Sequence, residues 1–306
     1  MSDTAVTVYD YFDKTTWGRI KAFSDTHETP FLVVDLATID RQYDEMLRHF
    51  PYARAYYAVK ANPAPQVLTL LRDKGACFDI ASTYELDKVL ALGVTPDRIS
   101  FGNTIKKAKD IRTFYQKGVR MFATDSEADL RNIAKAAPGA RIYTRILTEG
   151  TLTADWPLSR KFGCEPAAVV PMLELAQSLG VTVRGLSFHV GSQVAEPKKY
   201  VEAIGVCAEL TEQASASGLA ELTLLDIGGG FPIPYGGTMQ PIREFCRPIR
   251  QALKTLPRGV RVIAEPGRFI AGPSGTSVAT VVGRAQREGR WWYYLCLLYT
   301  SDAADE

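Results

Sequence analysis

Short apolar runs alternate with amphipathic stretches along the chain from about residue 53 onward. The runs are hydrophobic throughout rather than at every second position, which is typical of parallel strands buried on both faces. Several amphipathic stretches end at a glycine, which favours the left-handed conformation that closes a helix. We therefore predict strands at residues 53–60, 76–81, 98–101, 120–124, 141–147, 182–189, 222–227 and 261–265, with helices at 65–74, 84–92, 128–137, 168–179 and 200–217 between them.

This α/β pattern of eight strand–helix units predicts a closed (β/α)8 barrel of the TIM type. An open, doubly wound sheet is an alternative that periodicity alone does not exclude. The predicted strand ends favour the barrel, because a polar residue or a glycine at every carboxyl end is what an active-site face built from loops requires. These positions are Lys60, Asp79, Asn103, Asp125, Arg145, His189, residues 228–230 and Glu265.

Two segments lie outside the predicted barrel, which we expect to cover residues 35–272. Residues 1–34 come first and are expected to pack with a second domain, and FLVVD (31–35) resembles an extra strand entering the barrel. Residues 273–295 read as the start of a β-rich second domain that is cut short. Residues 296–306 (CLLYTSDAADE) resemble the translation of a sequencing adapter, so we expect a non-native tail and a natural protein that continues past Leu295.

Charge and composition exclude several classes of protein. Lys and Arg number 36 against 34 Asp and Glu, a formal net charge of +2, which argues against a nucleic-acid partner. No apolar stretch is long enough for a membrane span, and the first residues lack a secretory signal. The five cysteines have neither a disulfide pattern nor a zinc pattern. We expect a cytoplasmic globular protein without a metal.

Two of the strand-end motifs supply candidate reactive side chains. Lys60 ends the apolar run YYAVK, where desolvation favours the neutral amine that forms a Schiff base with a carbonyl. The alternative is a lysine that extends to solvent. His189 ends LSFH, where its imidazole could stack on a planar cofactor, and the nearby Ser192 hydroxyl could reach a phosphate. A structural histidine is the alternative.

Two further motifs could bind an anion. Gly228, Gly229 and Gly230 follow a predicted strand, and backbone N–H groups of such a run can surround a phosphate, although a tight turn is the alternative. In AEPGR, Glu265 could face a ring nitrogen and Arg268 a phosphate, unless the two form only a surface ion pair. Together, these groups are the set that pyridoxal 5'-phosphate requires: an amine, an anion cradle and a carboxylate.

Six motifs occur in the order YYAVKAN, FDIAS, LSRKFG, GLSFHVGSQ, LLDIGGGFP and EPGR. Over about residues 30–295 they resemble the pyridoxal-phosphate decarboxylases of basic amino acids with the alanine-racemase fold (fold type III). The pattern is most similar to the ornithine decarboxylase branch, which includes bacterial enzymes that also accept lysine. Glu265 separates these decarboxylases from the racemases of the fold, which have an arginine at the pyridine nitrogen.

This resemblance implies a reaction and a set of roles. A basic amino acid would lose its α-carboxyl group as CO2 and leave as a diamine for polyamine biosynthesis. Lys60 would form the Schiff base, His189 would stack on the ring and Glu265 would face the pyridine nitrogen. The remaining cofactor-binding positions implied by the family are Asp79, Arg145, Ser192, Gly230, Gly267 and Arg268.

The resemblance also implies a homodimer in which a second domain completes the neighbouring subunit's site. In the family that domain supplies a cysteine, an acidic residue and a tyrosine, and no cysteine here lies in such a motif. The chain as written is therefore expected to be poorly active. Three alternatives stay open: a diaminopimelate or arginine decarboxylase of the same fold, a non-catalytic regulatory homologue, and a Schiff-base aldolase.

Overall fold

The computed structural model describes residues 7–148, 154–156, 161–235 and 239–297, with only the backbone at 154–156. By their internal contacts the residues divide into two units. One runs from Leu36 to Pro273, and the other combines Met1–Asp35 with Ser274–Glu306. Among the described residues, no helix is both long enough and apolar enough to cross a membrane.

The larger unit is a closed parallel barrel in the strand order β10-β11-β2-β3-β4-β5-β6-β8. All eight predicted strands are confirmed with slightly shorter bounds, and the closed order excludes the open-sheet alternative. Most of the strand residues are buried, as the continuous apolar runs indicated. The strands are β2 (Ala53–Ala58), β3 (Cys77–Ile80), β4 (Ile99–Phe101), β5 (Met121–Thr124), β6 (Arg141–Arg145), β8 (Thr182–Ser187), β10 (Leu224–Asp226) and β11 (Arg261–Ala264).

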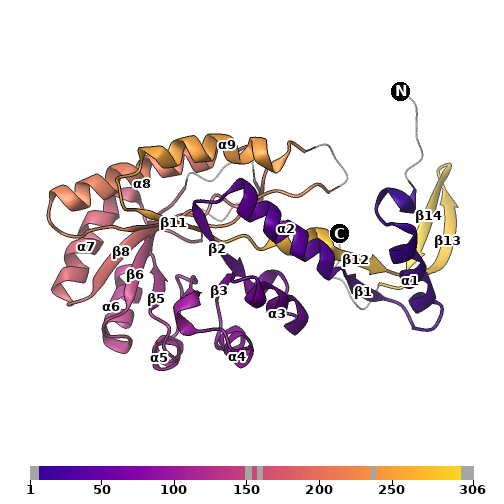
Figure 1. Cartoon of the computed structure of the whole chain (residues 1–306), viewed down its shortest axis with the longest axis horizontal. Coiled ribbons are helices and arrows are strands. Elements are labelled where there is room, and N and C mark those ends of the chain that lie inside the picture. Colours follow the sequence, from indigo (N-terminus) through magenta and orange to yellow (C-terminus); the bar gives the residue numbers. More distant parts are fainter. Residues whose placement is uncertain (1–6, 149–153, 157–160, 236–238, 298–306) are drawn as a thin grey trace. The chain divides into compact units, whose positions relative to one another are not determined.

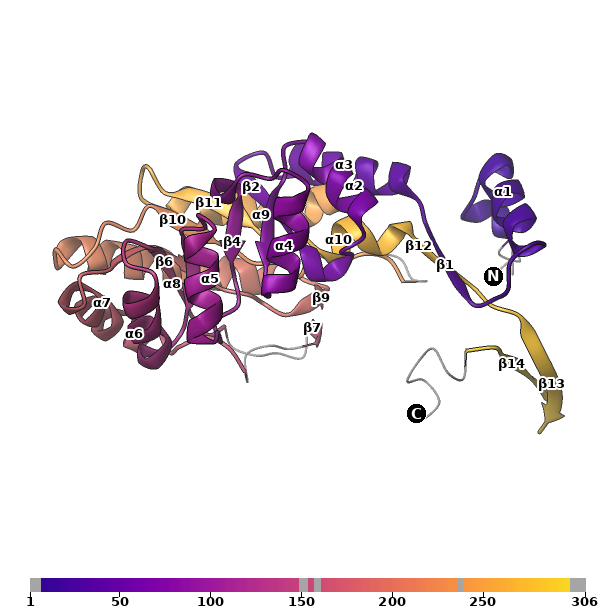
Figure 2. The same ribbon diagram turned by 90° about the horizontal axis from the view of Figure 1, so that it is seen from below.

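Helices surround these strands (Figure 1), and a view turned by 90° shows α4, α5, α6 and α7 following one another around the barrel (Figure 2). The predicted glycine caps at 75, 93, 118, 180 and 218 all have positive φ. This conformation costs glycine little and lets the chain turn directly into the next strand. The helices are α2 (Leu36–His49), α3 (Pro65–Asp73), α4 (Thr83–Ala91), α5 (Ala108–Gln116), α6 (Glu127–Ala136), α7 (Val169–Ser178), α8 (Lys198–Ala216), α9 (Ile242–Ala252) and α10 (Arg268–Ala271).

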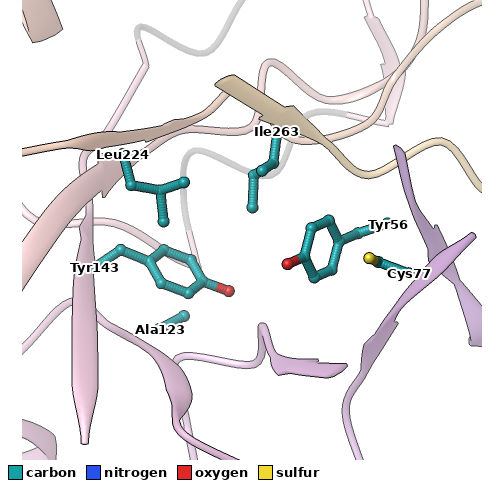
Figure 3. Packing of buried hydrophobic residues seen from close by; sticks show 6 residues of the cluster. All are labelled: Tyr56, Cys77, Ala123, Tyr143, Leu224 and Ile263. Carbon is teal, nitrogen blue, oxygen red and sulfur yellow. The ribbon is translucent and has the colours of Figure 1, made fainter. Parts of the chain in front are cut away.

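The middle of the barrel is filled by a layer of buried side chains from six strands. The hydroxyls of Tyr56 and Tyr143 point toward one another in this layer (Figure 3). The layer lies between the carboxyl end of the barrel and its amino end, where Cys77 and Leu224 are the first residues of β3 and β10. Its members are Tyr56, Cys77, Ala123, Tyr143, Leu224 and Ile263, with Met121 packed against them.

Two more strands form a small antiparallel sheet, β7 (Ala154–Trp156) with β9 (Ser192–Val194), after barrel strands β6 and β8. Residue Gln193 of β9 has a φ of 57°, an uncommon conformation for a side chain other than glycine. Its side-chain amide is bonded to both backbone polar groups of Ile233. These two bonds hold the β9 segment against the loop that follows β10.

The smaller unit contains α1 (Lys14–Ser24), the pair β1 (Phe31–Val34) and β12 (Gly275–Val278), and the hairpin β13 (Val281–Arg287) and β14 (Arg290–Leu295). The prediction that residues 31–35 enter the barrel is wrong, because β1 pairs antiparallel with β12 and with no barrel strand. None of its residues is fully buried, so it lacks the two covered faces of the barrel strands. Of the expected tail at 296–306, only Cys296 and Leu297 lie within the described residues.

Candidate active site

Three side chains that lie far apart in the sequence meet at the carboxyl end of the barrel. Lys60 is exposed in the turn Val59–Ala61 directly after β2, Asp79 is the third residue of β3, and Glu265 follows β11. Burial raises the pKa of both carboxyl groups, and the positive charge of Lys60 acts on each of them in the opposite direction. The amine and the two acids therefore belong to one end and one electrostatic environment.

Gly102 shows how closely the two acids approach. A Cβ atom at this position would lie 2.1 Å from Asp79 Oδ1 and 3.1 Å from Glu265 Oε1. Both carboxyl groups thus face the backbone just after β4, where only glycine leaves them room. The Ser100 hydroxyl donates to Asp79 Oδ1 at 3.3 Å and fixes its orientation.

Asp226, the last residue of β10, adds a third carboxyl group to this site. It is 1% exposed, accepts a hydrogen bond from the Gly228 N–H at 2.8 Å, and is hydrogen-bonded to Glu265. Burial raises the pKa of Asp226 to about 7 and that of Asp79 to about 8, the latter with a further contribution from Glu265. Burial raises the pKa of Glu265 as well, and Asp226 adds to the increase. At neutral pH the cluster is therefore partly protonated.

His189 lies two residues beyond the end of β8, with its ring next to Gly229. Its Nδ1 accepts a hydrogen bond from the Gly191 N–H at 3.1 Å, which leaves the proton of the neutral ring on Nε2. Burial lowers the pKa of His189 well below its ordinary value, and the charges of Arg145 and Lys60 lower it further. The imidazole is therefore neutral, as a ring that stacks on a flat cofactor should be.

The glycine run after β10 makes contacts that a larger residue would prevent. A Cβ on Gly228 would lie 2.5 Å from Phe188 O, and one on Gly229 would lie 2.6 Å from Glu265 O and 3.3 Å from His189 Nε2. Gly230 has a φ of 103°, and its Cβ would lie 2.3 Å from Gly191 O. The run is thus more than a turn, because close approach requires glycine at each of the three positions.

Arg268, the first residue of α10, reaches the loop that contains His189 and Ser192. Its Nε donates to Ser192 Oγ at 3.1 Å and its Nη1 to Tyr235 Oη at 2.8 Å. Gly267 precedes it, and a Cβ there would lie 3.0 Å from Ala61 Cβ, beside the turn that contains Lys60. A guanidinium, a hydroxyl and a glycine loop therefore gather beside the amine, a combination suited to a phosphate.

The structure brings the predicted site residues together, with two exceptions among the strand-end positions. Asn103 and Asp125 bond to other loop residues instead. The backbone carbonyl of Asn103 accepts a hydrogen bond from the Lys106 amine at 2.9 Å. The Asp125 carboxyl accepts one from the Gly163 N–H at 2.8 Å. Arg145 ends β6, and its charge lowers the pKa of His189.

Sequence reasoning missed Asp226 and Gly102. The signal for Asp226 was present, since an acid at a strand end immediately before a glycine run is unlike an ordinary core residue. Gly102 had no comparable signal, because its importance depends on side chains from two other strands.

Comparison with known proteins supplies independent evidence. Residues 36–272 match the family described as "Pyridoxal-dependent decarboxylase, pyridoxal binding domain". The chain is 35% identical over 278 residues to the lysine/ornithine decarboxylase of Selenomonas ruminantium, covering 90% of this chain and 70% of that protein. It is 36% identical over 261 residues to antizyme inhibitor 2 of Xenopus laevis, covering 84% of this chain and 57% of that protein.

Among solved structures, the lysine/ornithine decarboxylase of Vibrio vulnificus in complex with putrescine superimposes with a TM-score of 0.86 at 39% identity. The match covers 93% of this chain and 76% of the other. Across the curated relatives compared, the chain spans 52% to 70% of their length. The resemblance inferred from the six motifs is confirmed, and the chain belongs to the family of pyridoxal-dependent decarboxylases.

Proposed function

We propose that the carboxyl end of this barrel binds pyridoxal 5'-phosphate and that the protein decarboxylates ornithine, with lysine as a second substrate. The single observation that supports this most directly is the convergence of the Lys60 amine with the buried acids Asp79, Asp226 and Glu265. A lysine amine near three carboxyl groups, a neutral imidazole and a glycine loop together supply the groups that pyridoxal phosphate requires. The names of the relatives point to the same substrates.

The residues fit the cofactor in charge as well as in shape. Three buried acids with raised pKa values are costly unless a positive group joins them, and a protonated pyridine nitrogen is such a group. The glycine run lies near Ser192, whose hydroxyl accepts from Arg268, so its backbone N–H groups could join these side chains in binding a phosphate. The acids suited to the ring nitrogen and the groups suited to the phosphate lie at the same end of the barrel.

Each residue then has a role with the cofactor. Lys60 would hold the aldehyde through its amine, and Glu265, supported by Asp226 and Asp79, would hold a proton at the ring nitrogen. His189 would lie against the ring, with its imidazole kept neutral by burial and by the charges of Arg145 and Lys60. The phosphate is held by Gly228, Gly229, Gly230, Ser192, Gly267 and Arg268.

When bound, pyridoxal phosphate supplies an aldehyde that condenses with amines and a ring that accepts the electron pair left when a carboxylate departs. Glu265 favours this chemistry, because a carboxylate keeps the ring nitrogen protonated where an arginine would not. Lys60 is the amine that would hold the aldehyde and would be exchanged for the substrate's α-amine. After that exchange its free amine would stay beside the reacting carbon.

A non-catalytic homologue is the competing reading from a different class. Such a protein has no need for Lys60, Glu265 and Arg268 together, and all three lie at one end here. Decarboxylation of arginine or diaminopimelate by the same site is the alternative within the class. We further propose a homodimer and a cytoplasmic location, on the sequence grounds given above.

The test is borohydride reduction of the protein with and without pyridoxal phosphate, followed by peptide mass analysis. We expect a reduced adduct on the peptide that contains Lys60, and none in Lys60→Ala, because a secondary amine forms only at the lysine that bound the aldehyde. Lys135→Ala, which removes a surface lysine on α6, is the matched control and should retain the adduct.

Diamine release from ornithine, lysine, arginine and diaminopimelate should then be measured with the wild type. We expect release to be slow, in line with the poor activity predicted for this chain, and fastest from ornithine. A full yield of adduct in Lys60→Ala would overturn the assignment of the lysine. Adduct formation without CO2 release from any of the four amino acids would favour the non-catalytic reading.

A further inference from the structure

Four arginines surround the opposite, amino-terminal end of the barrel. Arg54 lies on β2, Arg141 begins β6, Arg184 lies on β8 and Arg261 begins β11. All four are exposed, and all four line one cavity of about 460 Å³. This volume is within the range typical of small-molecule sites.

The positive charge of this cavity is not balanced by the protein. Asp97 is the one carboxylate on its lining, and no described carboxylate forms an ion pair with any of the four guanidiniums. The neighbouring Arg98 shows the contrast, since its guanidinium donates to the carbonyls of Ala76 and Arg72. Like charges around one cavity repel each other, so stability alone does not explain the arrangement.

The central layer forms the inner wall of the cavity. Tyr143 is 1% exposed, and its hydroxyl is buried without a hydrogen-bond partner among the described residues. The Ser100 hydroxyl lies near it but donates to Asp79. The Tyr143 hydroxyl points toward that of Tyr56 in Figure 3, and the acids Glu265, Asp226 and Asp79 act on it, so it faces the carboxyl end and not the arginines.

A second cavity of about 930 Å³ continues from the first at the same end and shares Arg54 and Arg261 with it. It adds two further cations, Arg250 on α9 and Lys254 just after it, together with the half-exposed ring of Tyr52. The space therefore combines a cationic part with an aromatic shelf.

We propose that the amino-terminal end of the barrel is a binding site for a small polyphosphate anion, separate from the catalytic end. Guanidiniums are the side chains best suited to phosphate oxygens, because each presents paired N–H donors. An anion here would neutralise the arginines. The phosphates could belong to an inorganic polyphosphate or to a nucleotide whose base lies on Tyr52.

The test uses the cofactor-loaded protein, so that the phosphate groups at the catalytic end are already occupied. Calorimetric titrations at low ionic strength would use sodium tripolyphosphate and, separately, magnesium-free ATP. We expect saturable binding by the wild type and affinity weaker by about tenfold or more in the double variant Arg141→Gln/Arg184→Gln, which loses two charge-assisted contacts. The matched control, Arg112→Gln/Arg243→Gln, removes the same charge from exposed positions on α5 and α9 and should bind as the wild type does.

Tighter binding of ATP that Tyr52→Ala reduces would identify a nucleotide, and equal affinities would identify the phosphates alone as the ligand. Either result supports the site. The proposal is overturned if neither anion saturates, if both double variants lose affinity equally, or if neither does. Because the variants leave the carboxyl end unchanged, their cofactor absorption should match that of the wild type, which separates this test from that of the proposed catalytic function.

Discussion

The two ends of the barrel differ in charge although the same strands build both. The carboxyl end gathers three buried acids around one exposed amine, and the amino end gathers four arginines around a cavity with one acid. Strand β6 has Arg141 at one end and Arg145 at the other, and β11 begins at Arg261 and is followed directly by Glu265. The central layer lies between the two ends.

The two ends of the barrel tolerate groups of like charge in different ways. At the carboxyl end, burial raises the pKa values of the acids, so the site can hold protons instead of negative charge. At the amino end, guanidiniums stay charged, and exposure to water and salt limits the repulsion. The first solution requires tight packing, whereas the second requires open space. Changes at the two ends should therefore have different sizes and different dependences on pH and salt.

The largest effect is expected where the carboxyl end is most tightly packed. Gly229→Ala would place a Cβ 2.6 Å from the Glu265 carbonyl oxygen and 3.3 Å from His189 Nε2. We expect a loss of about 2–3 kcal/mol in the free energy of unfolding, because backbone must move to make room, together with weaker cofactor binding. Urea unfolding and titration with pyridoxal phosphate would measure both.

Gly205→Ala is the matched control for this change. Gly205 lies inside α8, and nothing lies within 4 Å of its added Cβ. Alanine should stabilise the helix there by up to about 1 kcal/mol. Equal effects of the two substitutions would contradict the close approach at Gly229.

An intermediate effect is expected from Asp79→Asn in the cofactor-free protein. Because folding raises the pKa of Asp79 from 3.8 to about 8, the folded state retains a proton that the unfolded state releases, and stability falls as pH rises through this window. The Asp79→Asn variant should not show this pH-dependent loss of stability, because asparagine does not titrate. The free energy of unfolding of the variant, relative to that of the wild type, should therefore rise by roughly 2–4 kcal/mol between pH 5 and pH 8.

Thermal or urea unfolding of both proteins at the two pH values would check this sign. Asp110→Asn, in the first turn of α5, is a control with no comparable burial. A stability difference that stays constant with pH would show that Asp79 is not protonated in the folded state.

The smallest effect is expected at the amino end in the absence of any ligand. Arg141→Gln/Arg184→Gln removes two of the four repelling charges, so the free energy of unfolding should rise by about 0.5 kcal/mol at low salt and by less at high salt. Urea unfolding across a salt series would measure the change. A loss of stability at low salt would indicate that the arginines stabilise the barrel.

The sequence predicted those features that depend on local pattern. Continuous apolar runs identified the eight strands because both faces of each are covered, and Gly75 and Gly93 marked helix ends because of their backbone conformation. Lys60 and Glu265 were found because strand ends in a barrel meet at one face.

What the sequence did not reveal depends on contacts between distant segments. Residues 31–34 have the composition of a barrel strand, and only the position of β12 determines that they pair elsewhere. The grouping of Arg54 and Arg141 depends on which residues of β2 and β6 line the interior, which is set by barrel closure. Asp226 became part of the site through its contacts with Gly228 and Glu265.

The hydrogen-bonded carboxyl pair of Asp226 and Glu265 has a consequence for how the holoprotein assembles. Without a cationic ring beside them, the two carboxyl groups bind protons from the solvent. A cationic ring would displace at least part of this bound positive charge. Loading the vitamin derivative is then an exchange of one cation for another. The protons that are displaced pass to the buffer, so the buffer takes part in the reaction.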